Sequence, residues 1–116
     1  MEVEHRTLPR LDVLKISGRL DPVETPRLQE LINQLFDKGR SRILLDLANL
    51  DYINSAALRI LVSARKRAHE LKAEGSGRGD VRIVHLPPRI KQVFDLVGFT
   101  SLFEIYDDMV DAVASF

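Results

Sequence analysis

Cysteine is missing from the 116-residue sequence. Its absence excludes a disulfide scaffold, a thiolate nucleophile, a zinc site with cysteine ligands and an iron–sulfur cluster, and it is compatible with a reducing compartment. Long apolar runs are also missing, since none comes near the roughly 18 residues that a membrane span requires. The first six residues alternate charged and apolar side chains and do not have the pattern of a signal peptide. We therefore expect a cytoplasmic protein that does not insert directly into a membrane.

An excess of one sign of charge is absent as well. Lysine and arginine together number 17, and aspartate and glutamate also number 17, so the formal net charge is zero. Nucleic-acid-binding proteins use a broad positive field against the phosphate backbone, and this chain lacks one. The basic run at positions 65–67 has glutamates nearby, and we interpret it as a solvated helix face. Nucleic acid is therefore not an expected partner.

Residues with catalytic or metal-binding chemistry are few. The three histidines, His5, His69 and His85, fall on separate predicted elements and have neither metal-ligand nor catalytic-triad spacing. Asp46 and Asp51 form the best carboxylate pair, but no acid, base or nucleophile accompanies them. We expect no enzyme, no metal and no cofactor, and we interpret the histidines as surface or structural residues.

The composition is that of an ordinary folded protein. Apolar residues make up 45% of the chain and charged residues 29%, which argues against disorder and fibrous repeats. A length of 116 residues fits one domain with one adequate core. We therefore expect a single domain over residues 1–116.

Hydrophobic periodicity predicts alternating strands and helices. The clearest helix begins at Asp21, beside a proline, and ends at Gly39. The last helix, capped by an aspartate at 107 or 108, is expected to bury Val110, Val113 and Phe116. The expected strands are residues 2–7, 11–17, 42–47, 81–85 and 102–106, the other expected helices are residues 55–73 and 87–98, and residues 74–80 are an expected loop. This order predicts an α/β fold with a mixed four- to five-stranded sheet packed with about four helices.

One segment places a hydroxyl group at the start of a long helix. The predicted strand 42–47 is followed by a turn that brings Asn54 and Ser55 to the beginning of the helix. In open α/β sheets, binding sites gather at the carboxyl ends of strands. Helix capping by either side chain is one interpretation and is worth about 1 kcal/mol. A phosphoserine is the other, because a charge of about −1.5 to −2 would lie among free N–H groups at the positive end of the helix dipole.

Three motifs follow one another along the chain. They are Ser17-Gly18-Arg19-Leu20-Asp21, then Leu45-Asp46-Leu47 with Asn54-Ser55-Ala56-Ala57-Leu58, and finally Val97-Gly98-Phe99. In this order they resemble the STAS domains of bacterial anti-sigma-factor antagonists, whose pattern is S-G-R-L-D, a strand ending in L-D-L, a turn with D-S-[ST]-G-L, and a late G-[FL]. The resemblance covers essentially the whole chain and implies the STAS fold.

The resemblance implies an anti-sigma factor antagonist, which is a protein-binding switch in transcription regulation and stress response. In this family, a kinase that is itself the anti-sigma factor phosphorylates the serine of the D-S-[ST]-G turn. Phosphorylation blocks binding, and a serine phosphatase restores it. By position, that serine is Ser55. The surface expected to bind the partner comprises Gly18, Arg19, Leu20, Asp21, Asn54, Ser55, Ala56, Leu58, Arg59 and Val62.

The sequence departs from the family pattern at three positions. Asn54 stands in place of aspartate, Ala56 in place of the second hydroxyl residue, and Ala57 in place of glycine. We expect Ala57 to add a methyl group to the surface that a partner approaches. One alternative is therefore a constitutive, unphosphorylated STAS subunit of a larger complex, such as a lipid-transport ABC assembly. A small enzyme or nucleotide-binding domain is the weakest alternative, because no reactive constellation is present.

Overall fold

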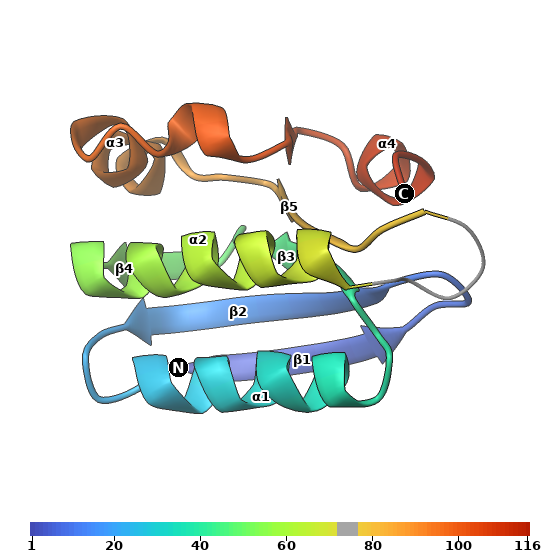
Figure 1. Cartoon of the computed structure of the whole chain (residues 1–116). Coiled ribbons are helices and arrows are strands. Elements are labelled where there is room, and N and C mark those ends of the chain that lie inside the picture. Colours follow the sequence, from blue (N-terminus) through green and yellow to red (C-terminus); the bar gives the residue numbers. More distant parts are fainter. Residues whose placement is uncertain (72–76) are drawn as a thin grey trace.

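The fold is seen in a computed structural model that describes residues 1–71 and 77–116. Figure 1 shows a sheet with α1 and α2 packed side by side across it. The predicted end of the second long helix near residue 73, and residues 74–76 of the predicted loop, lie outside the described residues.

The sheet has six strands within the described part of the chain. Five of them form the order β1-β2-β3-β5-β6, and β4 pairs with β2. β1 is antiparallel to β2, and every other pairing is parallel, which confirms the expected mixed sheet. The strands are β1 (Glu2–Thr7), β2 (Asp12–Leu20), β3 (Arg42–Asp46), β4 (Leu50–Ile53), β5 (Asp80–Val84) and β6 (Ile105–Tyr106).

Two strands differ from what the sequence predicts. β4 lies where only a turn is expected, so the sheet exceeds the expected four to five strands. Its four residues are too few for a periodic pattern, and it is a strand because it pairs with the end of β2. β6 keeps only the last two residues of the predicted strand 102–106, because Thr100–Leu102 forms a 3₁₀ turn.

Four α-helices lie in the described residues, which agrees with the expected number. They are α1 (Thr25–Asp37), α2 (Ser55–Glu70), α3 (Pro88–Leu96) and α4 (Met109–Ala114). α1 begins at Thr25 rather than at Asp21, because the Asp21 carboxylate accepts hydrogen bonds from the backbone N–H groups of Val23 (3.0 Å) and Glu24 (3.1 Å) and so forms a turn before the helix.

The last helix buries a different residue from the one predicted. Asp108 caps α4, since its carboxylate accepts a hydrogen bond from the backbone N–H of Val110 at 3.2 Å. Val110 itself is 72% exposed, and Ala112 is the fully buried residue of this helix. Val113 and Phe116 are partly buried against the sheet, as expected. With only six residues, α4 has too little periodicity to show which side faces the sheet.

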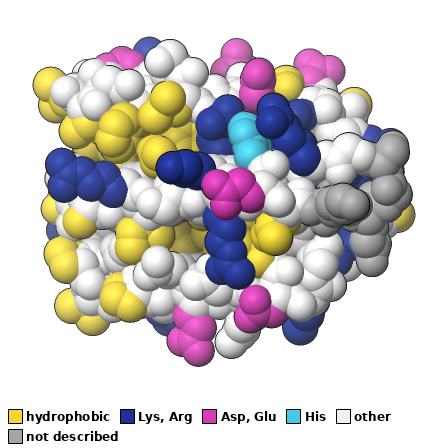
Figure 2. All heavy atoms as spheres, in the orientation of Figure 1, with side chains coloured by type: hydrophobic (Ala, Val, Ile, Leu, Met, Phe, Trp, Pro, Cys, Tyr) yellow, Lys and Arg dark blue, Asp and Glu magenta, His cyan; other side chains and the backbone are white. Residues whose placement is uncertain are grey.

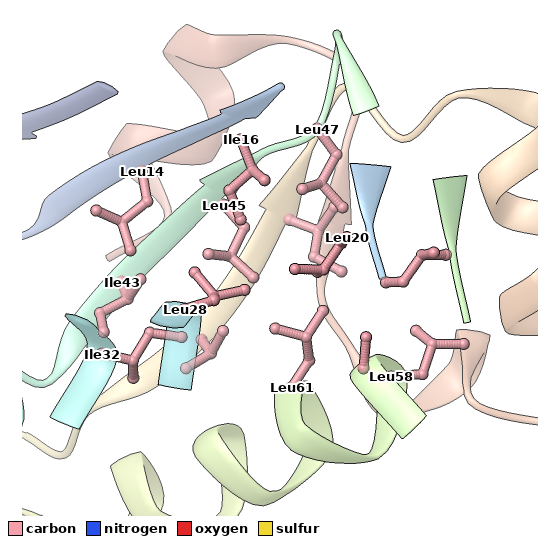
Figure 3. Packing of buried hydrophobic residues seen from close by; sticks show 14 of the residues in the cluster. Leu14, Ile16, Leu20, Leu28, Ile32, Ile43, Leu45, Leu47, Leu58 and Leu61 are labelled. Atoms are coloured by element: carbon pink, nitrogen blue, oxygen red, sulfur yellow. The ribbon is translucent and has the colours of Figure 1, made fainter. Parts of the chain in front are cut away.

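The sheet is buried on both faces. Figure 3 shows side chains of the central strands pointing toward α1 and α2 in the larger core cluster. Val13 and Leu44 point to the opposite face, where they pack with Ala112 of α4. Burial on both sides explains the nearly continuous apolar run of β3. The labelled core residues are Leu14, Ile16, Leu20, Leu28, Ile32, Ile43, Leu45, Leu47, Leu58 and Leu61.

The buried carboxylate of Asp12, the first residue of β2, links this strand to β1 and to the turn between α1 and β3. Asp12 is only 1% exposed. It accepts hydrogen bonds from Thr7 Oγ1 (2.9 Å) and Arg40 Nε (2.8 Å), and His5 Nε2 lies 2.7 Å from it. Burial by itself raises the pKa of Asp12, but the hydrogen bonds of His5, Arg40 and Thr7 and the charge of Arg40 outweigh it, so that the pKa lies below its ordinary value of 3.8.

This lowered pKa makes the stability of the fold sensitive to acid. Because the folded pKa of Asp12 lies below the unfolded one, its contribution is fully present above about pH 4 and is lost as the pH falls through the folded pKa. In urea unfolding between about pH 5 and pH 3, Asp12→Asn should therefore show a shallower loss of unfolding free energy than the wild type. The exposed control Asp107→Asn should keep the wild-type slope, and identical slopes for all three proteins would refute this role of Asp12.

Candidate functional site

The candidate site lies where two parallel strands end side by side. The last residues of β2 pair with β4, with Arg19 opposite Tyr52 and Leu20 opposite Ile53. The chain therefore leaves β2 and β4 at the same edge of the sheet. The β2 end leads into the turn before α1, and the β4 end leads directly into α2 (Figure 1). Two segments that are far apart in sequence are thus brought together by one ladder of backbone hydrogen bonds.

Gly18 marks the point where β2 changes its partner. Its φ of +85° lies in a region that residues with side chains rarely adopt, and the register shifts between Gly18 and Arg19. The backbone N–H of Gly18 donates to the Asn49 carbonyl at 3.0 Å, which anchors the turn before β4. Beyond this irregularity, the Arg19 guanidinium lies 4.2 Å from the centre of the Tyr52 ring. The strand end is therefore a fixed surface carrying an exposed cation.

Asn54 and Ser55, the two polar residues at the start of α2, have different roles. Asn54 is the cap, since its Oδ1 accepts a hydrogen bond from the backbone N–H of Ala57 at 2.8 Å. Ser55 is the first helical residue and is exposed. Within the described residues, its hydroxyl forms no hydrogen bond. The capping interpretation thus applies to Asn54, and the Ser55 hydroxyl remains accessible beside the first N–H groups of the helix.

The capping role predicts a measurable cost for losing the Asn54 side chain. Asn54→Ala should lower the free energy of unfolding by about 1 kcal/mol, because the Ala57 N–H loses its acceptor. Asn54→Asp should be as stable as the wild type or more so, since a carboxylate also caps and interacts favourably with the helix dipole. Ser55→Ala is the matched control and should change stability little. Urea unfolding measures all three, and equal losses for Asn54→Ala and Ser55→Ala would contradict this assignment.

Most residues of the expected partner surface are accessible. Arg19, Ser55, Ala56 and Arg59 are exposed. A second group is partly buried and borders them, namely Gly18, Asp21, Asn54 and Val62.

Two expected surface residues are instead core residues. Leu20 and Leu58 are both 0% exposed, and Figure 3 places them among the apolar side chains between the sheet and α2. The sequence interpretation was wrong for them, because a motif gives no information about which alternate residues face inward. They position the surface without being available to a partner. Ala57 needs the same correction, since it is 1% exposed and its methyl group lies in the core.

The structure adds two residues to this surface. Val23 lies in the turn between β2 and α1 and is 84% exposed, which is unusual for a large apolar side chain. Tyr52 is half-buried under Arg19 on β4. The proline before Val23 marks a turn in the sequence, but nothing there shows that the turn adjoins the start of α2.

Each histidine lies beside one aspartate. The distances between the ring nitrogen and the carboxylate oxygen are 2.7 Å for His5 and Asp12, 2.6 Å for His69 and Asp80, and 3.1 Å for His85 and Asp46. The described residues include no group of three side chains placed to hold a metal ion. Nor does the described part of the chain include a helix with the length and apolarity needed to cross a bilayer.

The fold and the site together define an α/β domain whose candidate site is an open surface at two strand ends, built around one exposed serine. The chain belongs to the STAS domain family, whose model matches residues 2–112.

Relatives and solved structures agree with this assignment. A protein of Bordetella bronchiseptica named as an anti-sigma factor antagonist, BtrV, is 29% identical over 113 residues, which cover 95% of this chain and 92% of that protein. A Thermotoga maritima structure named as an anti-sigma factor antagonist has a TM-score of 0.82 and 17% identity over 97% of this chain and 92% of its own. The Bacillus cell fate determinant SpoIIAA in its phosphorylated form has a TM-score of 0.74 and 14% identity over 98% of both chains. The structural similarities show a shared fold.

Proposed function

We propose that this protein is an anti-sigma factor antagonist that binds a kinase-type anti-sigma factor and is controlled by reversible phosphorylation of Ser55. In this proposal, the surface around Ser55 binds the kinase, and a serine phosphatase reverses the modification. The protein acts in the cytoplasm as a binding protein rather than an enzyme. The observation that carries the proposal is the exposed hydroxyl of Ser55, which forms no hydrogen bond with the described residues and lies beside the turn that follows β2. The name of the Bordetella relative supports the function, and the phosphorylated SpoIIAA structure supports modification of a protein with this fold.

Phosphate at Ser55 is compatible with the fold but not with a close interface. The first N–H groups of α2 and its dipole can accept a charge of about −1.5 to −2, so the domain should stay folded. The same charge would have to be desolvated when a partner covers the surface. Each ~1.4 kcal/mol of this cost weakens binding tenfold. Phosphorylation can therefore release the partner without a large conformational change.

The first test is intact-mass spectrometry with site mapping on protein isolated from its own cells, together with identification of copurifying proteins. A single phosphate at Ser55 and a copurifying serine kinase are the expected result. An unmodified chain under several growth and stress conditions would overturn the proposal. Copurification with a membrane-transporter ATPase would then identify the constitutive STAS subunit, an alternative that rests on the departures from the family pattern at Asn54 and Ala57.

A further inference from the structure

We propose that a second surface, at the opposite end of α2, binds a small anion of the phosphate class. A hollow of about 270 Å³ lies there between the C-terminal half of α2 and the starts of β3 and β5. Figure 2 shows Lys and Arg side chains grouped around a histidine on the face that is turned toward the viewer in Figure 1. The residues of the hollow on which the proposal rests are Arg42, Arg65, His69, Arg78, Asp80 and Arg82.

The hollow has more basic than acidic groups. Among the described residues, four arginines line it, together with the carboxylates of Asp80 and Glu104. Arg42 is the first residue of β3, Arg78 lies just before β5, Arg82 lies within β5, and Arg65 comes from α2. Arginine stays charged at all physiological pH values, so the positive charges of these arginines are permanent. A surface of this kind attracts anions even though the whole chain has no net charge.

Asp80 holds the arginines in place without neutralising all of them. Its carboxylate lies 2.8 Å from Arg82 Nε, 3.6 Å from Arg65 Nε and 2.6 Å from His69 Nε2. Asp80 is only 7% exposed and so lies beneath the cations rather than in front of them. Asp80 contacts both guanidinium groups through Nε, and Arg82 Nη1 also donates to the Ser115 carbonyl and hydroxyl. Arg65 is therefore the arginine of this pair whose terminal nitrogens form no hydrogen bond with the described residues. Fixed guanidinium forks are the groups that bind phosphate oxygens in pairs.

One donor in the hollow lacks an acceptor. Arg65 Nε is buried and forms no hydrogen bond with the described residues, and its distance to Asp80 exceeds hydrogen-bond length. A buried donor without a hydrogen bond is costly, and the charge of Asp80 at 3.6 Å offsets part of this cost while it fixes the orientation of the Arg65 guanidinium. Arg82 is braced from the other side, where its Nη1 donates to the Ser115 carbonyl at 2.6 Å and its guanidinium stacks 4.5 Å from the Phe116 ring. The cationic side chains are thus positioned before any anion arrives.

Size limits the class of anion. A volume of about 270 Å³ lies just below the range of about 300–1,000 Å³ that is usual for pockets of drug-sized ligands. Phosphate or pyrophosphate fits this space, whether it is a free anion or the diphosphate part of a nucleotide. The hollow is separate from the Ser55 surface, because 14 helical residues, or about 21 Å, separate Ser55 from His69 along α2. The inference therefore does not depend on the proposed partner switch.

The test is calorimetric titration of inorganic pyrophosphate into the full chain at constant ionic strength, with a parallel titration of ADP. We expect saturable one-to-one binding of pyrophosphate. Arg65→Gln and Arg78→Gln should each weaken it about tenfold, since each removes one charge-assisted contact. Arg78 is exposed, so Arg78→Gln should keep the fold even if Arg65→Gln does not, and thermal unfolding checks both variants.

The matched control is Lys66→Gln, which removes one positive charge from the same helix at an exposed residue outside the hollow. It should bind pyrophosphate as the wild type does. Tighter binding of ADP than of pyrophosphate would assign the site to a nucleotide, and equal affinity would assign it to the free anion. Absence of saturable binding to the wild type, or equal weakening by Lys66→Gln and Arg78→Gln, would overturn the proposal.

Discussion

Ser55→Glu is expected to weaken binding of the anti-sigma factor by about a hundredfold, whereas Ser55→Ala should bind as the unmodified protein does. The glutamate places one negative charge at the exposed first residue of α2, in a surface that the partner must cover. A hundredfold change corresponds to about 2.8 kcal/mol, which is in the range of the cost of desolvating a charge without a partner. A titration of the copurifying partner with each purified variant measures this difference.

Size and charge can be separated at the same position. A glutamine side chain has nearly the same size and shape as glutamate but is neutral. The dissociation constant of Ser55→Gln for the partner should therefore lie within a few-fold of that of Ser55→Ala. Equal weakening by glutamine and glutamate would mean that bulk rather than charge blocks the interface. Equal dissociation constants for the alanine and glutamate variants would remove Ser55 from the interface altogether. Unchanged thermal unfolding of all variants would show that the effect lies in binding.

Gly79→Ala should be among the most destabilising small substitutions in the described part of the chain. A Cβ at this position would lie 2.4 Å from the Ser41 carbonyl oxygen and 2.5 Å from Ser41 Oγ. Relief requires movement of the backbone at the starts of β3 and β5, where the Asp80 N–H donates to the same carbonyl at 3.0 Å. We expect a loss of about 3 kcal/mol in unfolding free energy and a melting temperature lower by about 10 °C.

Gly39→Ala provides the comparison for this prediction. Gly39 has a φ of +78°, but a Cβ there would meet no atom within 4 Å. Its replacement should therefore cost only the backbone strain, which is about 1 kcal/mol. Urea unfolding of both variants separates the cost of steric overlap at Gly79 from the cost of backbone strain at Gly39. A smaller loss for Gly79→Ala than for Gly39→Ala would show that the close approach to Ser41 is relieved without cost.

The long elements could be predicted because their patterns are long. α1 and α2 each present several apolar residues at helical spacing, and β3 is apolar on both faces because both faces are buried. β4 could not be predicted, since its four residues become a strand only by pairing with the irregular end of β2. The start of α1 was misplaced because Asp21 has the same preference for a turn as for a helix cap.

The candidate site was predictable in position but not in detail. The motif places Ser55 at a helix start, yet only the geometry assigns the cap to Asn54. Leu20 and Leu58 look like surface residues in the motif because the direction of a side chain depends on strand pairing and helix rotation. The basic hollow was hidden for another reason. Arg65 and Asp80 are separated by a chain segment whose course the sequence does not define, so the run at 65–67 reads as an ordinary solvated face.

β2 is shared between two neighbours, with β3 along residues 12–15 and β4 along residues 18–20. β4, whose end leads to Ser55, is therefore paired with a strand that is also part of the central sheet, so the two halves of the Ser55 surface cannot drift apart without breaking backbone hydrogen bonds. A partner meets a surface that is already formed, so little ordering is needed on contact. For a switch of the proposed kind, the response time would then be set by the amounts of kinase and phosphatase in the cell. The domain itself would add no delay.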